Sequence, residues 1–149
     1  MHMENLMRGK RSFIHRQPPV ICQWASVVGK KEAEGPLATY FDYAEQNTYF
    51  GQKTWEQAEK RMQQLALETL AQKAGMQVQD LGLVISGDLL NQCIGSSFSL
   101  RNLSVAHLGL YGACSTMAES LLTASMAVSG GFADRVAAMT SSHFASSER

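Results

Sequence analysis

Tyr111-Gly112-Ala113-Cys114-Ser115-Thr116 is the stretch of the sequence that decides the fold. An apolar run at 105–111 with the length of a strand leads into it, and a long apolar helical pattern at 116–129 follows it. Gly112 and Ala113 are the small residues that a sharp turn from strand to helix requires. We therefore expect Cys114 at the head of a buried helix, directly after a strand.

The chain on both sides of this turn alternates between strand and helix patterns. Strands are predicted at 20–28, 81–86, 105–111 and 135–140, and helices at 54–75, 96–103 and 116–129. A long connection is predicted at 30–52. Such alternation is typical of an α/β fold, a βαβαβαβ order with a mainly parallel sheet, right-handed crossovers and helices on both faces.

The clearest helix begins at Thr54, which together with Gln57 fits a capping box. It ends at Gly75, where the left-handed conformation costs little. Its apolar residues repeat at helical spacing and are Trp55, Ala58, Met62, Leu65, Ala66 and Leu70. We expect this face to pack on the sheet, with the charged residues and glutamines on the opposite face.

The composition is that of a globular domain without a nucleic-acid surface. Of the 149 residues, 45% are hydrophobic and 17% are charged, and the 13 basic residues balance the 13 acidic ones. No basic stripe stands out, which argues against nucleic acid as a partner. The cysteines Cys22, Cys93 and Cys114 show no C-x-x-C spacing, so we expect neither a disulfide framework nor a metal site, and no cofactor.

The termini and the apolar stretches predict a cytoplasmic chain. Residues 1–11 are polar and basic and lack the apolar centre of a secretory signal. The most apolar stretch, 105–133, is interrupted by His107, Glu119 and several glycines, so no transmembrane segment is expected.

Cys114 is the candidate nucleophile. The free N–H groups and the dipole at a helix N-terminus favour the thiolate, which is the reactive form of cysteine. The alternative is an inert, buried thiol, as most free cysteines are. The pattern from Gly112 to Thr116 is not the G-x-S-x-G turn of α/β-hydrolases, because its fifth residue is Thr116.

Polar residues also follow two other predicted strands. Asp88 and Asn91 come after 81–86, and His143 comes after 135–140. Open α/β sheets bind ligands at this edge, so these residues join Cys114 and Ser115 as candidate ligand-binding residues. The alternatives are that Asp88 only fixes its own turn by bonding the backbone, and that His143 is a loop histidine bonded to the backbone.

Four motifs, in this order, resemble the stage V sporulation protein AD family of the thiolase-like superfamily. They are Gly87-Asp88-Leu89-Leu90-Asn91-Gln92, Tyr111-Gly112-Ala113-Cys114-Ser115-Thr116, Ser129-Gly130-Gly131-Phe132-Ala133 and Thr140-Ser141-Ser142-His143. The resemblance runs from about residue 9 to residue 149. It implies a thiolase-like N-terminal half, with 1–17 as an N-terminal extension and 18–149 as a truncated half-domain.

The resemblance also implies a function. Family members are associated with the transport of dipicolinic acid, as its calcium chelate, during sporulation and germination. They act with other stage V sporulation A proteins at the inner spore membrane, so the resemblance implies a cytoplasmic or peripheral location. It implies that the chain binds dipicolinate without catalysis, with Cys114 at the nucleophile position of catalytic relatives and Asp88 and His143 near the same pocket.

Two other interpretations remain. One is a thiolase-like or ketoacyl-synthase-like acyltransferase with Cys114 as nucleophile, but in catalytic relatives the partner residues come from a second half. The other is a degenerate fragment. Because family members carry two similar halves, the apolar helix 116–129 should keep one uncovered face here. Large apolar patches mark interfaces, so we expect self-association or contact with a missing second half.

Overall fold

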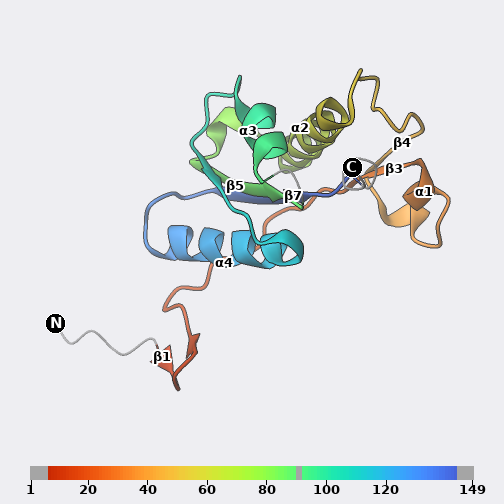
Figure 1. Cartoon of the computed structure of the whole chain (residues 1–149). Helices are drawn as coiled ribbons and strands as arrows, with labels where there is room; N and C mark the ends of the chain where they lie inside the picture. Colours follow the sequence, from red (N-terminus) through yellow and green to blue (C-terminus); the bar gives the residue numbers. More distant parts are fainter. Residues whose placement is uncertain (1–6, 90–91, 144–149) are drawn as a thin grey trace.

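The computed structural model describes residues 7–89 and 92–143 (Figure 1). Its main sheet has three parallel strands in the order β6-β5-β7, which are β5 (Leu83–Asp88), β6 (His107–Gly109) and β7 (Val136–Ser141). The central strand β5 is buried over nearly its whole length, as expected for a strand covered on both faces.

Helices cover both faces of this sheet. Helix α4 (Thr116–Ser129) lies on one face, and α2 (Trp55–Ala74) and α3 (Ile94–Leu100) lie on the other (Figure 1). The predicted α/β fold with parallel strands and helices on both faces is therefore confirmed. The three strands and three helices found here all fall within a few residues of the predicted ranges.

The remaining elements are short. Strands β1 (Met7–Arg8) and β2 (Ser12–Phe13) form an antiparallel hairpin, and β3 (Val27–Gly29) pairs in parallel with β4 (Tyr43–Glu45). One-turn elements complete the described chain, namely α1 (Lys30–Ala33) and the 3₁₀ turns Ala38–Tyr40, Val78–Asp80 and Ala113–Ser115. The predicted connection 30–52 therefore contains a strand, β4, that its sequence pattern did not reveal.

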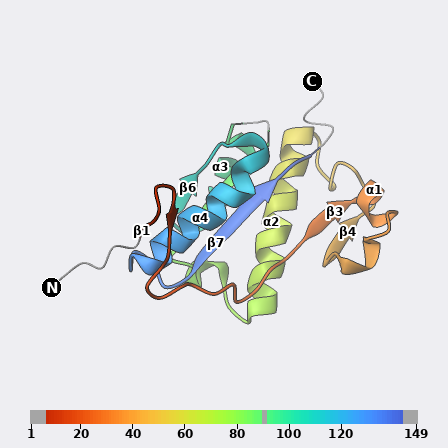
Figure 2. The ribbon, with the colours of Figure 1, turned by 90° about the horizontal axis from the view of Figure 1, so that it is seen from below.

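The prediction of a strand at 20–28 is largely wrong. Only Val27–Gly29 is a strand, and it belongs to the small sheet with β4 rather than to the main sheet (Figure 2). The apolar residues before it are exposed, Val20 by 78% and Ile21 by 73%, and Cys22 lies exposed outside any strand. Residues 27–29 pair with β4 instead of with the edge of β7, so the strand that forms here belongs to the small sheet.

Helix α2 has the predicted ends. The Thr54 Oγ1 atom accepts a hydrogen bond from the Gln57 N–H at 3.3 Å, and Gly75 closes the helix with φ 64°. The return bond of the capping box is shifted by one residue, since the Gln57 Oε1 atom accepts from the N–H of Lys53 at 3.3 Å. The Gln57 side chain thus bonds the backbone N–H of Lys53, the residue before the N-cap Thr54.

The expectation that all polar residues of α2 face away from the sheet is wrong. Glu59 and Gln63 are only 2% and 1% exposed, on the same face as the buried Leu67 and Ala71. The apolar centre is formed by Leu67, Val84, Leu100, Ala137 and Met139. At the C-terminal ends of β5 and β7 this centre gives way to polar residues, which supply partners for the two buried α2 side chains.

Helix α4 contacts the sheet through small residues. Its buried residues are Thr116, Ser120 and Ala124, and a Cβ atom on Gly87 of β5 would meet the Thr116 methyl group at 2.7 Å. The larger apolar residues point away and are 41–47% exposed; they are Met117, Leu121, Leu122 and Met126. The expected uncovered face of this helix is confirmed. Within residues 7–89 and 92–143, no helix is both long and apolar enough to cross a bilayer.

Candidate functional site

Cys114 lies at the head of α4, as predicted. The turn before it puts Ala113 at φ 48°, a left-handed conformation that is uncommon for a residue with a Cβ atom. Thr116 fixes this turn, since its Oγ1 atom accepts from the Gly112 N–H at 3.2 Å and donates to the Ala113 carbonyl at 2.8 Å. The Cys114 side chain is exposed, so the alternative of a buried, inert thiol does not describe it.

Glu119 occupies part of the same helix N-terminus. The Ser115 hydroxyl lies within bonding distance of the Gly112 carbonyl at 2.7 Å and of the Glu119 Oε1 atom at 2.5 Å. Glu119 folds over Gly112 so closely that a Cβ atom there would collide with the carboxylate. The N–H groups and dipole of α4 therefore already face one negative charge, and any second anion must compete with it.

A cavity of about 220 Å³ opens beside Cys114. It lies where β5 and β7 end and α4 begins, and it is lined by Leu89, Ala113, Cys114, Met117, Thr140, Ser141 and Ser142. The hydroxyls of Thr140 and Ser142 are exposed at its wall. This is the edge of a parallel sheet where ligands commonly bind.

Asp88 does not line this cavity, although it ends the neighbouring strand. Alternate residues of a strand face opposite sides of the sheet. Gly87 faces Thr116 of α4, whereas the Asp88 carboxylate faces Gly95 of α3, with Oδ2 3.4 Å from where a Gly95 Cβ atom would lie. Asp88 and Cys114 therefore share an edge of the sheet but lie on opposite faces.

The Asp88 carboxylate is fully buried, and neither of its oxygens has a hydrogen-bond partner within the described structure. The alternative that Asp88 only fixes its own turn through the backbone therefore does not hold. Asn91, the other candidate after this strand, lies outside the described residues.

His143 follows β7 and turns toward the helix α2 side. Its ring is 9% exposed, and Nε2 lies 2.8 Å from the carbonyl oxygen of Thr48. The rings of Trp55 and Phe50 lie against it, with centroids at 5.2 and 6.3 Å. This geometry matches the alternative of a loop histidine bonded to the backbone, and His143 does not line the cavity at Cys114.

A buried polar layer on the α2 and α3 side is the site feature that sequence reasoning missed. Gln63 Nε2 donates to Ser141 Oγ at 2.6 Å and to Ser96 Oγ at 3.3 Å, and Gln63 Oε1 accepts from Ser99 Oγ at 2.8 Å. Ser141 Oγ donates in turn to Glu59 Oε1 at 2.7 Å. The signal was present, because Glu59, Gln63 and the buried Leu67 follow each other at four-residue spacing along one helix face.

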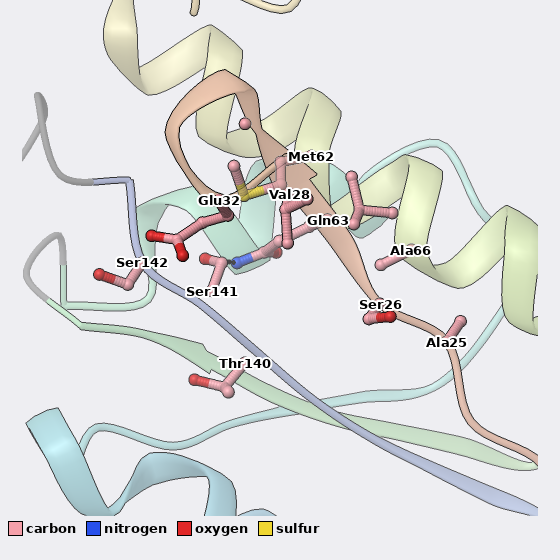
Figure 3. Close-up of a pocket in the computed structure, with 12 residues that line it drawn as sticks. Ala25, Ser26, Val28, Glu32, Met62, Gln63, Ala66, Thr140, Ser141 and Ser142 are labelled. Atoms are coloured by element: carbon pink, nitrogen blue, oxygen red, sulfur yellow. Dashed lines mark hydrogen bonds between the residues drawn. The ribbon is translucent and has the colours of Figure 1, made fainter. Parts of the chain in front are cut away.

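A second cavity, of about 300 Å³, separates β3 from the free edge of β7 (Figure 3). Its walls are the segment Ala25–Gly29 with Glu32, the α2 residues Met62, Gln63 and Ala66, and Thr140–Ser142. The buried polar layer therefore borders this cavity through Gln63 and Ser141.

Cys93, just before α3, and His107 of β6 both have shifted pKa values. Burial, and after it the charge of Asp88, raises the pKa of the Cys93 thiol, whose Sγ donates to the Leu110 carbonyl at 3.1 Å. Burial lowers the pKa of His107, whose Nε2 lies 2.9 Å from the Ser86 hydroxyl. Cys93 is thus held as a neutral thiol, consistent with a structural role.

Comparison with known proteins gives consistent results. The sequence model of the family described as Stage V sporulation protein AD (SpoVAD) matches residues 9–149. The chain is 37% identical over 143 residues to Stage V sporulation protein AD of Bacillus subtilis (strain 168). This alignment covers 96% of the chain but 42% of the relative, so the chain spans about two fifths of the length of that protein. The chain therefore belongs to the stage V sporulation protein AD family.

Proposed function

We propose that this chain is a non-catalytic, dipicolinate-binding part of the spore's dipicolinic acid transport system, during sporulation and germination. The observation that carries the proposal is the cavity of about 220 Å³ at the head of α4. Membership of a sporulation family supplies the biological setting, and the cavity supplies a place for a small planar ligand.

The walls of this cavity suit an aromatic dicarboxylate. Leu89 and Met117 provide apolar surface for a flat ring, and Thr140 and Ser142 provide hydroxyl donors for carboxylate oxygens. The N-terminus of α4 also favours an anion through its N–H groups and dipole, and a bound carboxylate would share this end of the helix with Glu119. In this proposal Cys114 contacts the ligand and is not a nucleophile.

Calorimetric titration with dipicolinate tests the proposal. We expect saturable binding by the purified chain, and affinity at least tenfold lower when Thr140→Val and Ser142→Ala are combined. Ser129→Ala is the matched control, because it removes an exposed hydroxyl at the other end of α4. Isophthalate, which lacks the ring nitrogen, tests whether that atom is recognised. Absence of binding to the unmodified chain would end the proposal.

The proposed partners are the other stage V sporulation A proteins, with the chain held peripherally at the inner spore membrane. Family membership supports this part of the proposal. The measurement is fractionation of spores that produce a tagged chain. We expect recovery with the inner membrane, and release from it in strains that lack the other proteins of the system.

An acyltransferase is the second candidate, favoured by the exposed Cys114 thiol on its left-handed turn. A thiolase-type enzyme also needs a base near the sulfur. The described histidines bond elsewhere: His15 to Ser125, His107 to Ser86 and His143 to Thr48. Mass spectrometry after incubation with acyl-CoA separates the two functions. A stable acyl adduct on Cys114, absent in Cys114→Ser, would favour the enzyme.

A further inference from the structure

Strand β7 has one edge that pairs with no strand in the described part of the chain. The sheet order is β6-β5-β7, so β7 has a neighbour on one side only. The Leu89 N–H donates to the Ser141 carbonyl at 3.1 Å, so the backbone groups of Ser141 face β5. Along a strand, the backbone groups of successive residues point to opposite edges. The β7 residues whose N–H and C=O groups point to the free edge are therefore Val136, Ala138 and Thr140.

Strand β3 presents a similar edge to β7. Its partner is β4, and the Ser26 carbonyl accepts from the Tyr43 N–H at 3.2 Å. By the same alternation, the N–H and C=O groups of Val27 point away from β4. In Figure 2, β3 lies between β4 and β7, so these groups are on the side of β7. The cavity of about 300 Å³ lies between the two edges, with Val27 and Thr140 among the residues of its walls (Figure 3).

Both edges lack the features that commonly keep a strand edge from pairing. Natural sheets protect their edges with charged residues, proline, bulges or a covering segment. Strand β7 reads Val-Ala-Ala-Met-Thr-Ser and β3 reads Val-Val-Gly, so neither contains a charged residue or a proline. Edges of this composition are suited to accept another strand.

The walls of the cavity select a single extended polypeptide segment. Rows of alternating N–H and C=O groups match the main chain of an extended peptide, which adds to a sheet edge through backbone hydrogen bonds. A second copy of the whole sheet does not fit, because its edge strand would bring its own helices while β3 closes the outer side of the gap (Figure 2). Alternate side chains of an inserted segment would meet Met62 and Ala66 of α2, so that side of the segment should be apolar (Figure 3).

We propose that an extended polypeptide segment inserts between β3 and β7 and bonds to both edges, which joins the two small sheets into one. The segment comes from the part of the family's polypeptide that this chain does not cover. The Bacillus subtilis relative supports this choice, because the aligned region is 42% of its length and the remainder is available to supply a strand. The inference concerns assembly and does not depend on dipicolinate binding at Cys114.

Production of both polypeptides in one cell tests the inference. The full chain is expressed together with the unaligned remainder of the Bacillus subtilis relative, which carries an affinity tag as a separate polypeptide. The quantity measured is the amount of chain recovered with the tag, and we expect equal amounts of the two polypeptides. Failure to recover the unmodified chain would overturn the inference.

A proline variant tests whether the β7 edge makes the contact. Ala138→Pro removes an N–H that points to the free edge, where a strand tolerates proline, so the circular dichroism of the chain alone should not change. Recovery with the tagged polypeptide should fall at least about tenfold. Val20→Pro is the matched control, because it places proline in another exposed segment that lies outside any helix or strand, and it should not reduce recovery. Equal recovery of the Ala138→Pro chain would refute the inference.

Hydrogen exchange of the unmodified chain, measured by nuclear magnetic resonance, gives the same answer without a substitution. In the free chain, the amides of Ala138 and Thr140 should exchange at least about tenfold faster than those of Ala137 and Met139, which face β5. In the complex, the amides of Ala138, Thr140 and Val27 should become protected. A complex that leaves these three amides unprotected would contradict the insertion. Protection of the same amides in a concentrated solution of the chain alone would assign the edge to a second copy and contradict the proposed occupant.

Discussion

The position of Glu119 shows how one residue can set the anion affinity of a helix N-terminus. Its carboxylate reaches back to Ser115 and covers Gly112, so it lies beside the turn that carries Cys114. A carboxylate in this place stabilises the helix through the dipole. The same charge repels a second anion in the adjacent cavity, so helix stability and ligand affinity oppose each other at this residue.

Glu119→Gln should therefore strengthen dipicolinate binding. The amide can still accept the Ser115 hydrogen bond, while the loss of negative charge is worth about 0.5–1 kcal/mol, or about two- to fivefold in affinity. Calorimetry at low ionic strength measures the change, and Glu34→Gln, which removes an exposed carboxylate just after α1, is the control. Weaker binding by Glu119→Gln would mean that Glu119 contacts the ligand or holds the turn that does.

His107 gives the fold a pH dependence of defined sign. Burial lowers the pKa of this histidine below its ordinary value of 6.5, so the unfolded chain binds more protons in the window between the two values. Its contribution to the free energy of unfolding is complete above pH 6.5 and is lost as the pH falls through the lowered pKa. The neutral ring is the form that the folded protein keeps.

His107→Gln should remove this contribution, because an amide can still bond the Ser86 hydroxyl but does not titrate. Urea denaturation between pH 7.5 and pH 5 measures it. The unmodified chain should lose stability below pH 6.5 more steeply than the variant. Parallel curves for the two proteins would show that His107 does not contribute to the acid sensitivity.

Single residues also show what the sequence can and cannot predict about the site. Cys114 was placed correctly because a glycine, a small residue and an apolar helix pattern define the turn locally. Asp88 was assigned to the same edge, but the strand alternation that turns it away from Cys114 depends on which face each helix covers. His143 bonds the Thr48 carbonyl and lies against Trp55, outside the cavity at Cys114. Both partners are distant in sequence, so the sequence pattern around His143 could not predict these contacts.

At the scale of elements, local signals predicted helices better than strands. Helix α2 carries its own start and stop at Thr54 and Gly75, so its limits follow from the sequence alone. A strand has no such independence, because its existence requires a neighbour. The apolar run 20–28 has the composition of a strand and yet remains outside the main sheet, since its only strand residues pair with β4.

The cap of α2 is open to a direct stability test. Thr54→Ala removes the oxygen that accepts the Gln57 N–H and should lower the free energy of unfolding by about 1 kcal/mol. Thr54→Ser keeps that oxygen and should lie within a few tenths of the unmodified chain. Urea denaturation with far-ultraviolet circular dichroism measures both. An equal loss in the serine variant would assign the effect to the threonine methyl group rather than to the cap.

At the scale of the whole molecule, the distribution of apolar surface is the dominant feature. Small side chains of α4 face the sheet, while Met117, Leu121, Leu122 and Met126 face outward and Phe132 just after the helix is 86% exposed. We call these five residues the α4 face. Contiguous exposed apolar surface of this kind is typical of an interface. The sequence motifs predict a thiolase-like fold, and the exposure of the α4 face does not test that prediction.

We propose that the α4 face joins two copies of this chain. Leu122 and Met126 lie one turn apart on α4 and are 47% and 46% exposed, so pairing them across an interface would remove apolar side chains from water with little rearrangement. Sedimentation velocity over a range of concentrations should show a shift from monomer to dimer. The double variant Leu122→Gln and Met126→Gln should remain monomeric under the same conditions.

Val20→Gln with Ile21→Gln is the control. It makes the same chemical change on apolar residues that are more exposed but lie elsewhere, and it should leave the dimer intact. A chain that is monomeric at every concentration would contradict the proposal, and loss of the dimer only in the Val20 and Ile21 variant would move the interface to the N-terminal segment.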